Sequence, residues 1–247
     1  MERKIRVAAV SYLNTKPLIY GFEEGMMKNE VELITDFPAR IADMLINDKA
    51  DISLVPVATI PLLGEYHIIT DYCIGSDGEV ASVCLFSNEP LEKITAILLD
   101  YQSRSSVALL KILLRDHWHI APQLIQGGEG YEDQIGGTVA GLVIGDRAFL
   151  QRKKSKYIYD LGSAWKELTG LPFVFAAWIA NKKLPDAFIE AFNKATGEGL
   201  KHLPAIIAAN PYEHYNLEKY YSENISFELD GEKRKGLKEF LEQMKAI

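Results

Sequence analysis

The alternation of short apolar runs with helical segments constrains the fold of this chain more than any other feature. Apolar, β-branched runs at 5–10, 31–34 and 51–56 have the length and composition of buried strands. The segments between them, 16–25 and 38–45, both carry a proline where the first turn of a helix tolerates one. This order of elements is typical of a parallel sheet. We therefore predict an α/β fold whose ligand site lies at the carboxyl ends of the strands.

Composition places the chain among ordinary globular proteins. Its 247 residues are 48% apolar and 25% charged, enough for a sizeable core in one large domain or two small ones. The net charge is −7 and basic residues do not cluster, which argues against nucleic acid as a partner. Cys73 and Cys84 lack the spacing of a metal site, so we expect free thiols, although a disulfide between them is an alternative.

The N-terminal segment does not have the pattern of an export signal. Only six apolar or near-apolar residues follow the first four, fewer than the core of a signal peptide needs. Elsewhere, no run approaches the roughly 20 apolar residues of a membrane helix. We therefore expect a cytoplasmic protein without a membrane partner.

Two long apolar runs, 80–87 and 173–180, bracket a self-contained α/β unit. We predict a two-lobed fold in which one lobe comprises 1–85 and 180–247, and 86–179 is inserted as the second. The two runs would be the strands that cross between the lobes and act as a hinge. Ligands prefer such interdomain clefts.

The loop after the first strand holds a dense group of hydrogen-bonding side chains. Ser11, Asn14, Thr15 and Lys16 precede Pro17, which opens a helix. The free N–H groups of a helix start favour an anion. Ser11 and Thr15 alone could serve as helix caps. Together with the amide and the ammonium group, they favour a binding loop.

A second group of donors stands before the helical segment 107–118. It consists of Ser103, Arg104, Ser105 and Ser106. Three hydroxyls are more than a helix cap needs, and a cation beside them is typical of an anion site. In the predicted fold, this group would face the first loop across the cleft.

Four further positions are candidate substrate contacts at or near strand ends. Ser53 is the one hydroxyl in its apolar strand, and we weigh it equally as a core serine. Ser82 lies within the 80–87 run. Gly145 permits a close approach of the backbone to a ligand. Asp146 is expected above all to cap the following helix.

Six motifs, in their order and spacing, resemble the chorismate dehydratase family over essentially the whole chain. They are SYLNTKPL at 11–18, DISLVP at 51–56, LD at 99–100 with SRSS at 103–106, IGDRA at 144–148, LTGLPFVFA at 168–176, and YY at 220–221 with NIS at 224–226.

The resemblance implies a type II periplasmic-binding-protein fold and a cytoplasmic enzyme of the futalosine route to menaquinone. The reaction would remove water from chorismate, a small dicarboxylate, to give 3-[(1-carboxyvinyl)oxy]benzoate, with no metal or organic cofactor. We assign catalysis to Asn14, whose amide would orient the enolpyruvyl carboxylate or the C4 hydroxyl. The general base is left open between the carboxylate of the substrate's own side chain, Asp146 and Glu79.

Other functions are compatible with such a fold. A solute-binding protein for a small carboxylate would share the cleft, but it usually needs an export leader. The sister enzyme that makes 1,4-dihydroxy-6-naphthoate would be expected to carry a histidine near 139–148, and this chain has none between His119 and His202. An effector domain of a transcription factor is weakened because no helix-turn-helix segment precedes residue 5.

Overall fold

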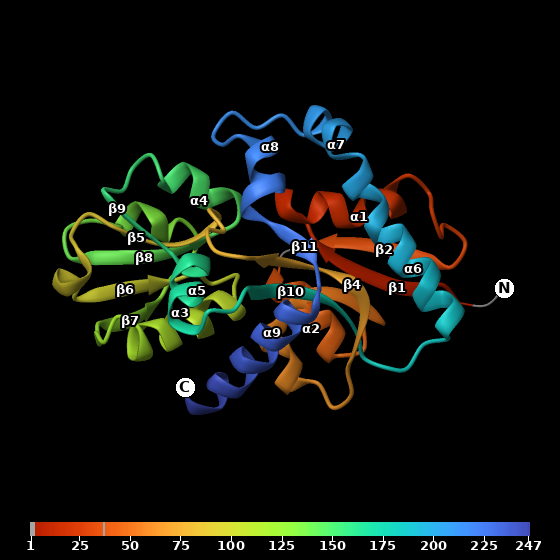
Figure 1. Ribbon diagram of the computed structural model, residues 1–247, viewed down its shortest axis with the longest axis horizontal. Helices are drawn as coiled ribbons and strands as arrows, with labels where there is room; N and C mark the ends of the chain where they lie inside the picture. The colour runs from red at the N-terminus through yellow and green to blue at the C-terminus, as the bar shows by residue number, and fades with distance from the viewer. Residues whose placement is uncertain (1–2, 37) are drawn as a thin grey trace.

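The chain folds into two lobes, each built around its own β-sheet (Figure 1). The computed structural model describes residues 3–36 and 38–247. The strands are β1 Ile5–Val10, β2 Val31–Asp36, β3 Ile52–Pro56, β4 His67–Ser76, β5 Val83–Ser87, β6 Ala96–Leu99, β7 Gln123–Gln126, β8 Val139–Ile144, β9 Tyr157–Asp160, β10 Phe173–Ala180 and β11 Ser226–Glu228. The helices are α1 Lys16–Glu23, α2 Pro38–Ile46, α3 Ser105–Asp116, α4 Asp146–Gln151, α5 Leu161–Thr169, α6 Asp186–Glu198, α7 Leu203–Ala209, α8 Leu217–Lys219 and α9 Gly231–Gln243.

The first sheet has the strand order β11-β4-β10-β3-β1-β2. β1 runs parallel to β2 and β3, as the alternation of the sequence predicts. β10 comes from much later in the chain and lies antiparallel between β3 and β4. α1 and α6 cover one face of this sheet, and α2 and α9 lie on the other (Figure 1). Every residue of β10 is buried, which explains why its sequence is a continuous apolar run.

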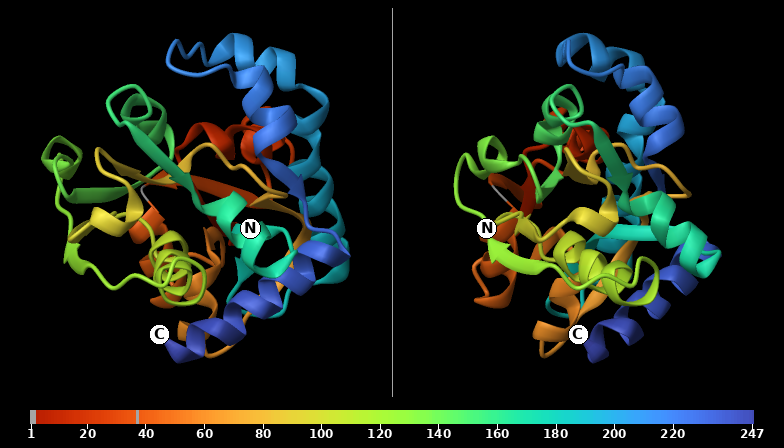
Figure 2. Two further views of the ribbon diagram at one scale, coloured as in Figure 1. Left: turned by 60° about the vertical axis from the view of Figure 1, so that its left-hand side comes forward. Right: turned by 90° about the vertical axis from the view of Figure 1, so that its left-hand side faces the viewer.

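The second sheet has the order β7-β6-β8-β5-β9. β6 is parallel to β7 and β8, whereas β5 is antiparallel to β8 and β9. α3 packs against α5, and α4 packs on β5 and β8. The long C-terminal segment returns to the first lobe, and α9 runs along its base (Figure 2). Both segments that join the two sheets therefore lie at the boundary between the lobes.

The chain passes between the sheets twice, in 77–82 and in 161–172. The two passages lead directly into β5 and β10. These strands lie in the two apolar runs, 80–87 and 173–180, that were expected to join the lobes. The borders predicted at 85/86 and 179/180 fall inside those strands, and each strand pairs within one sheet only. The change of sheet thus takes place nearer the N-terminus than the predicted borders in both cases.

The strand predicted over 80–87 is shorter than expected and begins at Val83. Ala81 has a φ of +61°, a left-handed conformation that interrupts a strand. The carboxylate of Asp160 accepts hydrogen bonds from the backbone N–H groups of Val80 (3.1 Å) and Ala81 (2.8 Å). Asp160, which lies far along the chain, therefore stabilises the bend. The apolar sequence of 80–87 gives no indication of this bend.

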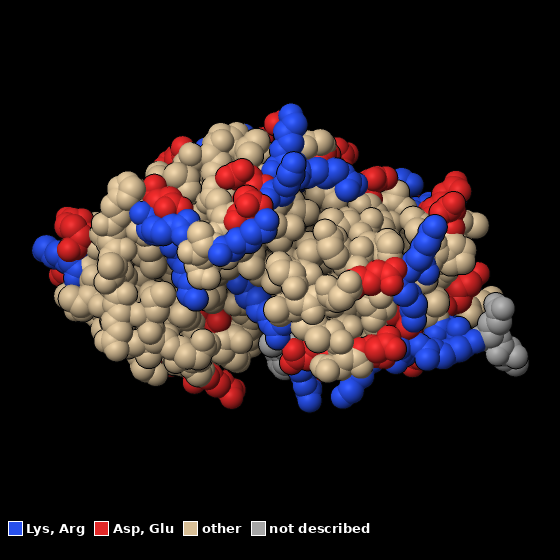
Figure 3. All heavy atoms as spheres, turned by 90° about the horizontal axis from the view of Figure 1, so that it is seen from below, with Lys and Arg blue, Asp and Glu red and all other residues tan. Residues whose placement is uncertain are grey.

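The charged surface and the two thiols agree with the expectations from composition, which were no cluster of basic residues and no disulfide. Acidic and basic side chains are interspersed over the face seen in Figure 3. Cys73 and Cys84 are free, as predicted, and both are buried, in strands of different sheets. Within residues 3–36 and 38–247, no helix is long and apolar enough to cross a membrane.

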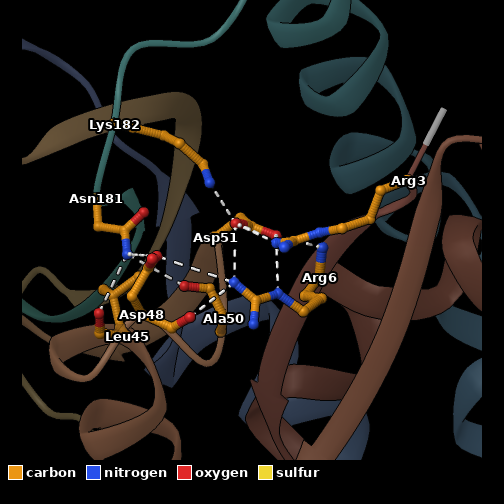
Figure 4. Close-up of polar contacts among 8 residues, drawn as sticks. All are labelled: Arg3, Arg6, Leu45, Asp48, Ala50, Asp51, Asn181 and Lys182. Atoms are coloured by element: carbon orange, nitrogen blue, oxygen red, sulfur yellow. Dashed lines mark hydrogen bonds and ion pairs between the residues drawn. The ribbon is translucent and has the colours of Figure 1, made fainter.

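A buried carboxylate joins three segments at the amino end of β3 (Figure 4). Arg6 donates two hydrogen bonds to the Asp51 carboxylate, one from its backbone N–H (2.9 Å) and one from its Nε (3.1 Å). Nη2 of Arg3 donates another (3.0 Å), and the ammonium group of Lys182 also pairs with Asp51. Burial alone would raise the pKa of the Asp51 carboxyl, but these hydrogen bonds hold it well below its usual range. The cluster fixes β1 and the end of β10 beside β3.

The variant Asp51→Asn tests this cluster. It should lower the free energy of unfolding at pH 7 by about 3 kcal/mol, because the cations lose their shared buried anion. A carboxyl with a depressed folded pKa stabilises the fold above its unfolded pKa, and this contribution disappears as pH falls through the folded pKa. The difference from wild type should therefore shrink below about pH 4. Urea unfolding at pH 7 and pH 3 measures both effects.

The control for this prediction is Asp48→Asn in the same cluster. Asp48 is exposed and lies 3.9 Å from Arg6, so we expect its loss to cost about 0.5 kcal/mol or less. Equal losses in the two variants, or a loss for Asp51→Asn that does not change with pH, would contradict the prediction.

Candidate active site

A cavity lies between the two sheets, where several strands reach their carboxyl ends. Val10 ends β1, Pro56 ends β3 and Ile144 ends β8, and all three line the cavity. Phe175 of β10 adds an aromatic ring to the apolar part of its wall. The polar part consists of Tyr12, Asn14, Ser82, Gln102, Ser103, Ser105 and Ser106. The cavity thus occupies the position at which open α/β sheets hold their ligands.

The loop after β1 contributes to this cavity through Asn14 and Tyr12. Residues 13–15 form a single 3-10 turn that leads into α1. Asn14 lines the cavity, and the hydroxyl of Thr15 donates to its Oδ1 at 3.3 Å. Thr15 is buried behind the loop, and Ser11 is exposed and lies outside the cavity lining. Of the predicted binding loop, the amide therefore faces the cavity and Thr15 stands behind it.

The serines at the start of α3 face the cavity from the second lobe. Ser103 Oγ accepts a hydrogen bond from the N–H of Ser106 (3.1 Å) and so caps the helix. Ser105 Oγ accepts one from the N–H of Ala58 in the first lobe (3.1 Å). Because that oxygen is already an acceptor, the Ser105 proton is available for a ligand.

Arg104 does not line the cavity, although the sequence suggested a cation beside the serines. Its Nη2 lies 2.8 Å from Oδ1 of Asp43 in α2, at the surface. The ion pair with Asp43 holds the Arg104 side chain toward α2, although its neighbours Ser103 and Ser105 line the cavity. The direction of the side chain thus excludes Arg104 from contact with a ligand in this cavity.

Gly145 and Asp146 bring the second lobe against the first loop. Gly145 has a φ of +63°, and a Cβ there would lie 3.2 Å from the ring of Tyr12, so both the conformation and the space require glycine. The carboxylate of Asp146 accepts from the N–H of Leu13 at 3.3 Å. Burial raises the pKa of Asp146 to about 6. Its side chain therefore links the lobes and lies outside the cavity lining.

Ser82 and Ser53 have different surroundings. Ser82 is buried, lines the cavity, and accepts a hydrogen bond from the hydroxyl of Tyr220 at 2.8 Å. Ser53 lies in the middle of the first sheet, opposite Ala8 and Ile179, and outside the cavity lining. Ser53 is therefore a core residue of β3.

A buried polar network beside the cavity was not found from sequence. Gln102 Oε1 accepts from the hydroxyl of Tyr12 and from Nη2 of Arg147 (3.3 Å). Arg147 also pairs with Asp100 at 2.7 Å, and Asp100 accepts from the hydroxyl of Tyr131 at 2.9 Å. In the sequence, Asp100 stands directly after the apolar strand β6, and Arg147 follows the end of β8 by three residues.

The cavity wall is uncharged. None of the lining residues, all of which lie in the described part of the chain, is Asp, Glu, Lys or Arg. The guanidinium of Arg147 stands one hydrogen bond behind the wall, at Gln102. Within the same part of the chain, no three His, Cys, Asp or Glu side chains gather as metal ligands. The arrangement can therefore bind oxygen atoms of a ligand through hydroxyl, amide and helix N–H donors.

Solved structures with this architecture include binding proteins. A crystal structure of a protein from Archaeoglobus fulgidus has a TM-score of 0.77 at 15% identity, covering 98% of this chain and 97% of its own. The alkanesulfonate-binding protein of Xanthomonas axonopodis pv. citri has a TM-score of 0.65 at 10% identity, covering 98% and 92%. A Candida albicans protein described as having the generic periplasmic binding protein fold has a TM-score of 0.63 at 13% identity, covering 99% and 91%. These likenesses confirm the predicted two-lobed, type II periplasmic-binding-protein-like fold.

Comparison with proteins of similar sequence indicates the family as well as the fold. The chorismate dehydratase of Thermus thermophilus is 28% identical over 263 residues, covering 94% of this chain and 92% of the relative. The chorismate dehydratase of Campylobacter jejuni is 26% identical over 245 residues, covering 96% and 92%. A family model described as menaquinone biosynthesis matches residues 5–246. Because that match spans both lobes and the cavity between them, the chain belongs to the menaquinone biosynthesis family.

Proposed function

We propose that this protein is a chorismate dehydratase. It would act as a carbon–oxygen lyase in the cytoplasm, removing water from chorismate to give 3-[(1-carboxyvinyl)oxy]benzoate in the futalosine route to menaquinone. The observation that carries the proposal is the match to two chorismate dehydratases along more than nine-tenths of each chain. The donors that line the interlobe cavity support it, since a small dicarboxylate needs such partners.

The reaction makes modest demands on the protein. The proton lost from C3 is vinylogous to the ring carboxylate, so negative charge spreads onto that carboxylate as the proton leaves. Departure of the C4 hydroxyl then gives an aromatic ring, which supplies a large driving force. The enzyme must hold the substrate so that proton and leaving group are aligned, and must stabilise the developing charge.

An uncharged cavity suits this chemistry. A cation in direct contact with a carboxylate would stabilise the ground state as well as the transition state, and such uniform binding does not raise kcat. Oriented neutral donors gain most where charge develops. In our proposal, the donors at the start of α3, which are Ser105, Ser106 and the N–H groups, receive one carboxylate. Asn14 lines the same cavity from the first lobe.

The base is best supplied by the substrate itself. Asp146 and Glu79 were the two candidates on the protein, and both lie outside the cavity lining. The Asp146 carboxylate accepts a hydrogen bond from the N–H of Leu13, and Glu79 forms an ion pair with Arg152 at 2.8 Å. The carboxylate of the substrate's enolpyruvyl group, oriented by Asn14, is then the base nearest to the C3 proton in our proposal.

Turnover distinguishes the proposed enzyme from a solute-binding protein. Purified protein incubated with chorismate should remove the diene absorbance of the substrate and form the substituted benzoate, as followed by absorbance and mass spectrometry. Saturable binding of chorismate without its consumption would instead support a carboxylate-binding protein of the same fold.

The variant Asn14→Ala tests the catalytic assignment. We expect kcat to fall by about 10²-fold, the scale of losing one preorganised donor, with a smaller change in KM. Asn14→Asp should be at least as inactive, because it places a like charge beside an anionic substrate. Steady-state kinetics measure both. A raised KM with an intact kcat would make Asn14 a binding residue only.

The double variant Ser105→Ala with Ser106→Ala tests the anion site at α3. Charge-assisted hydrogen bonds are worth about 1.5–3 kcal/mol each, so KM for chorismate should rise at least about tenfold. Ser155→Ala is the control, because that hydroxyl accepts a hydrogen bond from Gln151, lies outside the cavity lining, and should leave KM unchanged. An unchanged KM in the double variant would contradict the site.

Glu79→Gln and Asp146→Asn test the base. Each variant keeps the oxygen acceptor but removes the basic group, so we expect kcat to stay within about threefold of wild type if the substrate is the base. Asp146, with its pKa near 6, would otherwise impose a rise in kcat/KM with pH around that value. A loss of about 10³-fold in either variant would identify that carboxylate as the base. Measurement of kcat/KM from pH 5 to pH 8 completes the test.

A further inference from the structure

Tyr220 is a fully buried tyrosine next to the candidate active site. It opens a single turn of π-helix, Tyr220–Asn224, and such turns are frequent at functional sites. Its ring makes an edge contact with Phe149 of α4, at a centroid distance of 5.0 Å. Figure 1 shows α8, which directly precedes Tyr220, reaching from the first lobe toward α4. Tyr220 is thereby fixed by packing from both lobes.

The Tyr220 hydroxyl donates to Oγ of Ser82 at 2.8 Å, and both residues have 0% exposed surface. Burial raises the pKa of this phenol, whereas its contacts with Ser82 and Asn14 lower it by less, so the hydroxyl stays protonated and remains a donor. A serine hydroxyl has one proton and accepts through its lone pairs. With Tyr220 as donor, Ser82 must donate its own proton elsewhere, and it lines the cavity.

The backbone around Ser82 is held independently of Tyr220. Asp160 accepts the N–H groups of Val80 and Ala81, and Nη1 of Arg152 donates to the carbonyl of Ala81 at 3.0 Å. These contacts fix the chain but leave the Ser82 hydroxyl free to rotate. The hydrogen bond from Tyr220 removes that freedom.

On this basis, and resting on the proposed function, we propose that Tyr220 is a positioning residue for the dehydration. Its hydroxyl holds Ser82 so that the Ser82 proton is donated to an oxygen atom of the bound substrate. Tyr220 itself touches the substrate nowhere in this arrangement and acts through Ser82. Tyr220 also contacts Asn14, so the part of its effect that runs through Ser82 is the part that should disappear when the Ser82 hydroxyl is absent.

The test compares Tyr220→Phe, Ser82→Ala and the double variant in steady-state turnover of chorismate. Tyr220→Phe keeps the buried ring and removes only the donor, so kcat should fall about tenfold with little change in KM. In the Ser82→Ala background, the same substitution should lower kcat by clearly less than tenfold, since the group that it orients is gone and only the contact with Asn14 remains. Thermal unfolding of each variant checks that the protein is folded at the temperature of the assay.

Tyr215→Phe is the matched control. Tyr215 belongs to the same aromatic group and stacks on Phe149, but its hydroxyl donates to Asn224 at 3.0 Å and not to Ser82. We expect its kcat to stay within about twofold of wild type. If Tyr220 served only to stabilise the fold, both tyrosine variants would lower the melting temperature and neither would change kcat.

The outcomes separate this inference from the proposed function. Wild-type protein without turnover would overturn both. Active wild type with an unchanged Tyr220→Phe, or with Tyr220 and Ser82 effects that multiply, would overturn only the positioning role. A crystal structure of the wild type with 3-[(1-carboxyvinyl)oxy]benzoate gives a second measurement that needs no variant. Ser82 Oγ should lie within hydrogen-bond distance of both Tyr220 and the ligand, and an Oγ turned away from the ligand would contradict the proposal.

Discussion

The carboxylate of Asp160 lies where the chain changes sheets in both directions, and the relative placement of the two lobes depends on it. It accepts the N–H groups of Val80 and Ala81 in the first passage, and those of Gly162 and Ser163 at the start of α5 in the second. Four such bonds to one carboxylate are charge-assisted and geometrically demanding. They tie the bend before β5 to the helix that leads toward β10, so both connections are held at one point.

The candidate active site is assembled on that frame from segments that are distant in sequence. Asn14 comes from the loop after β1, Ser82 from the first passage, and Ser105 from the start of α3. Tyr220 joins them from the C-terminal part of the chain. Neutral donors from both lobes therefore converge on one cavity, while the charged pair of the polar network, with Arg147, stays behind the wall. Such a division leaves neutral donors at the wall and keeps the guanidinium of Arg147 one hydrogen bond away from it.

The same two-lobed fold occurs in binding proteins, such as the alkanesulfonate-binding protein of Xanthomonas axonopodis pv. citri. A fold of this kind supplies a cleft, and the side chains in the cleft decide what happens there. An anion-binding protein needs complementarity to its ground-state ligand alone. A dehydratase needs donors that are oriented before the charge appears. In this cavity, the oxygens of Ser82 and Ser105 are each held by a hydrogen bond from another segment, Tyr220 for Ser82 and Ala58 for Ser105.

The parallel strands, the two-lobed α/β architecture and the loops that carry Asn14 and Ser105 could be predicted from the sequence, because these depend on local periodicity and on helix starts. The pairing of Arg104 with Asp43 and the link that Asp146 makes between the lobes could not be predicted in this way. These outcomes depend on the direction of one side chain and on contacts between residues 60 to 140 positions apart along the chain. Hydrogen bonds of that range are set by the packing of complete elements, for which a local sequence pattern contains no signal.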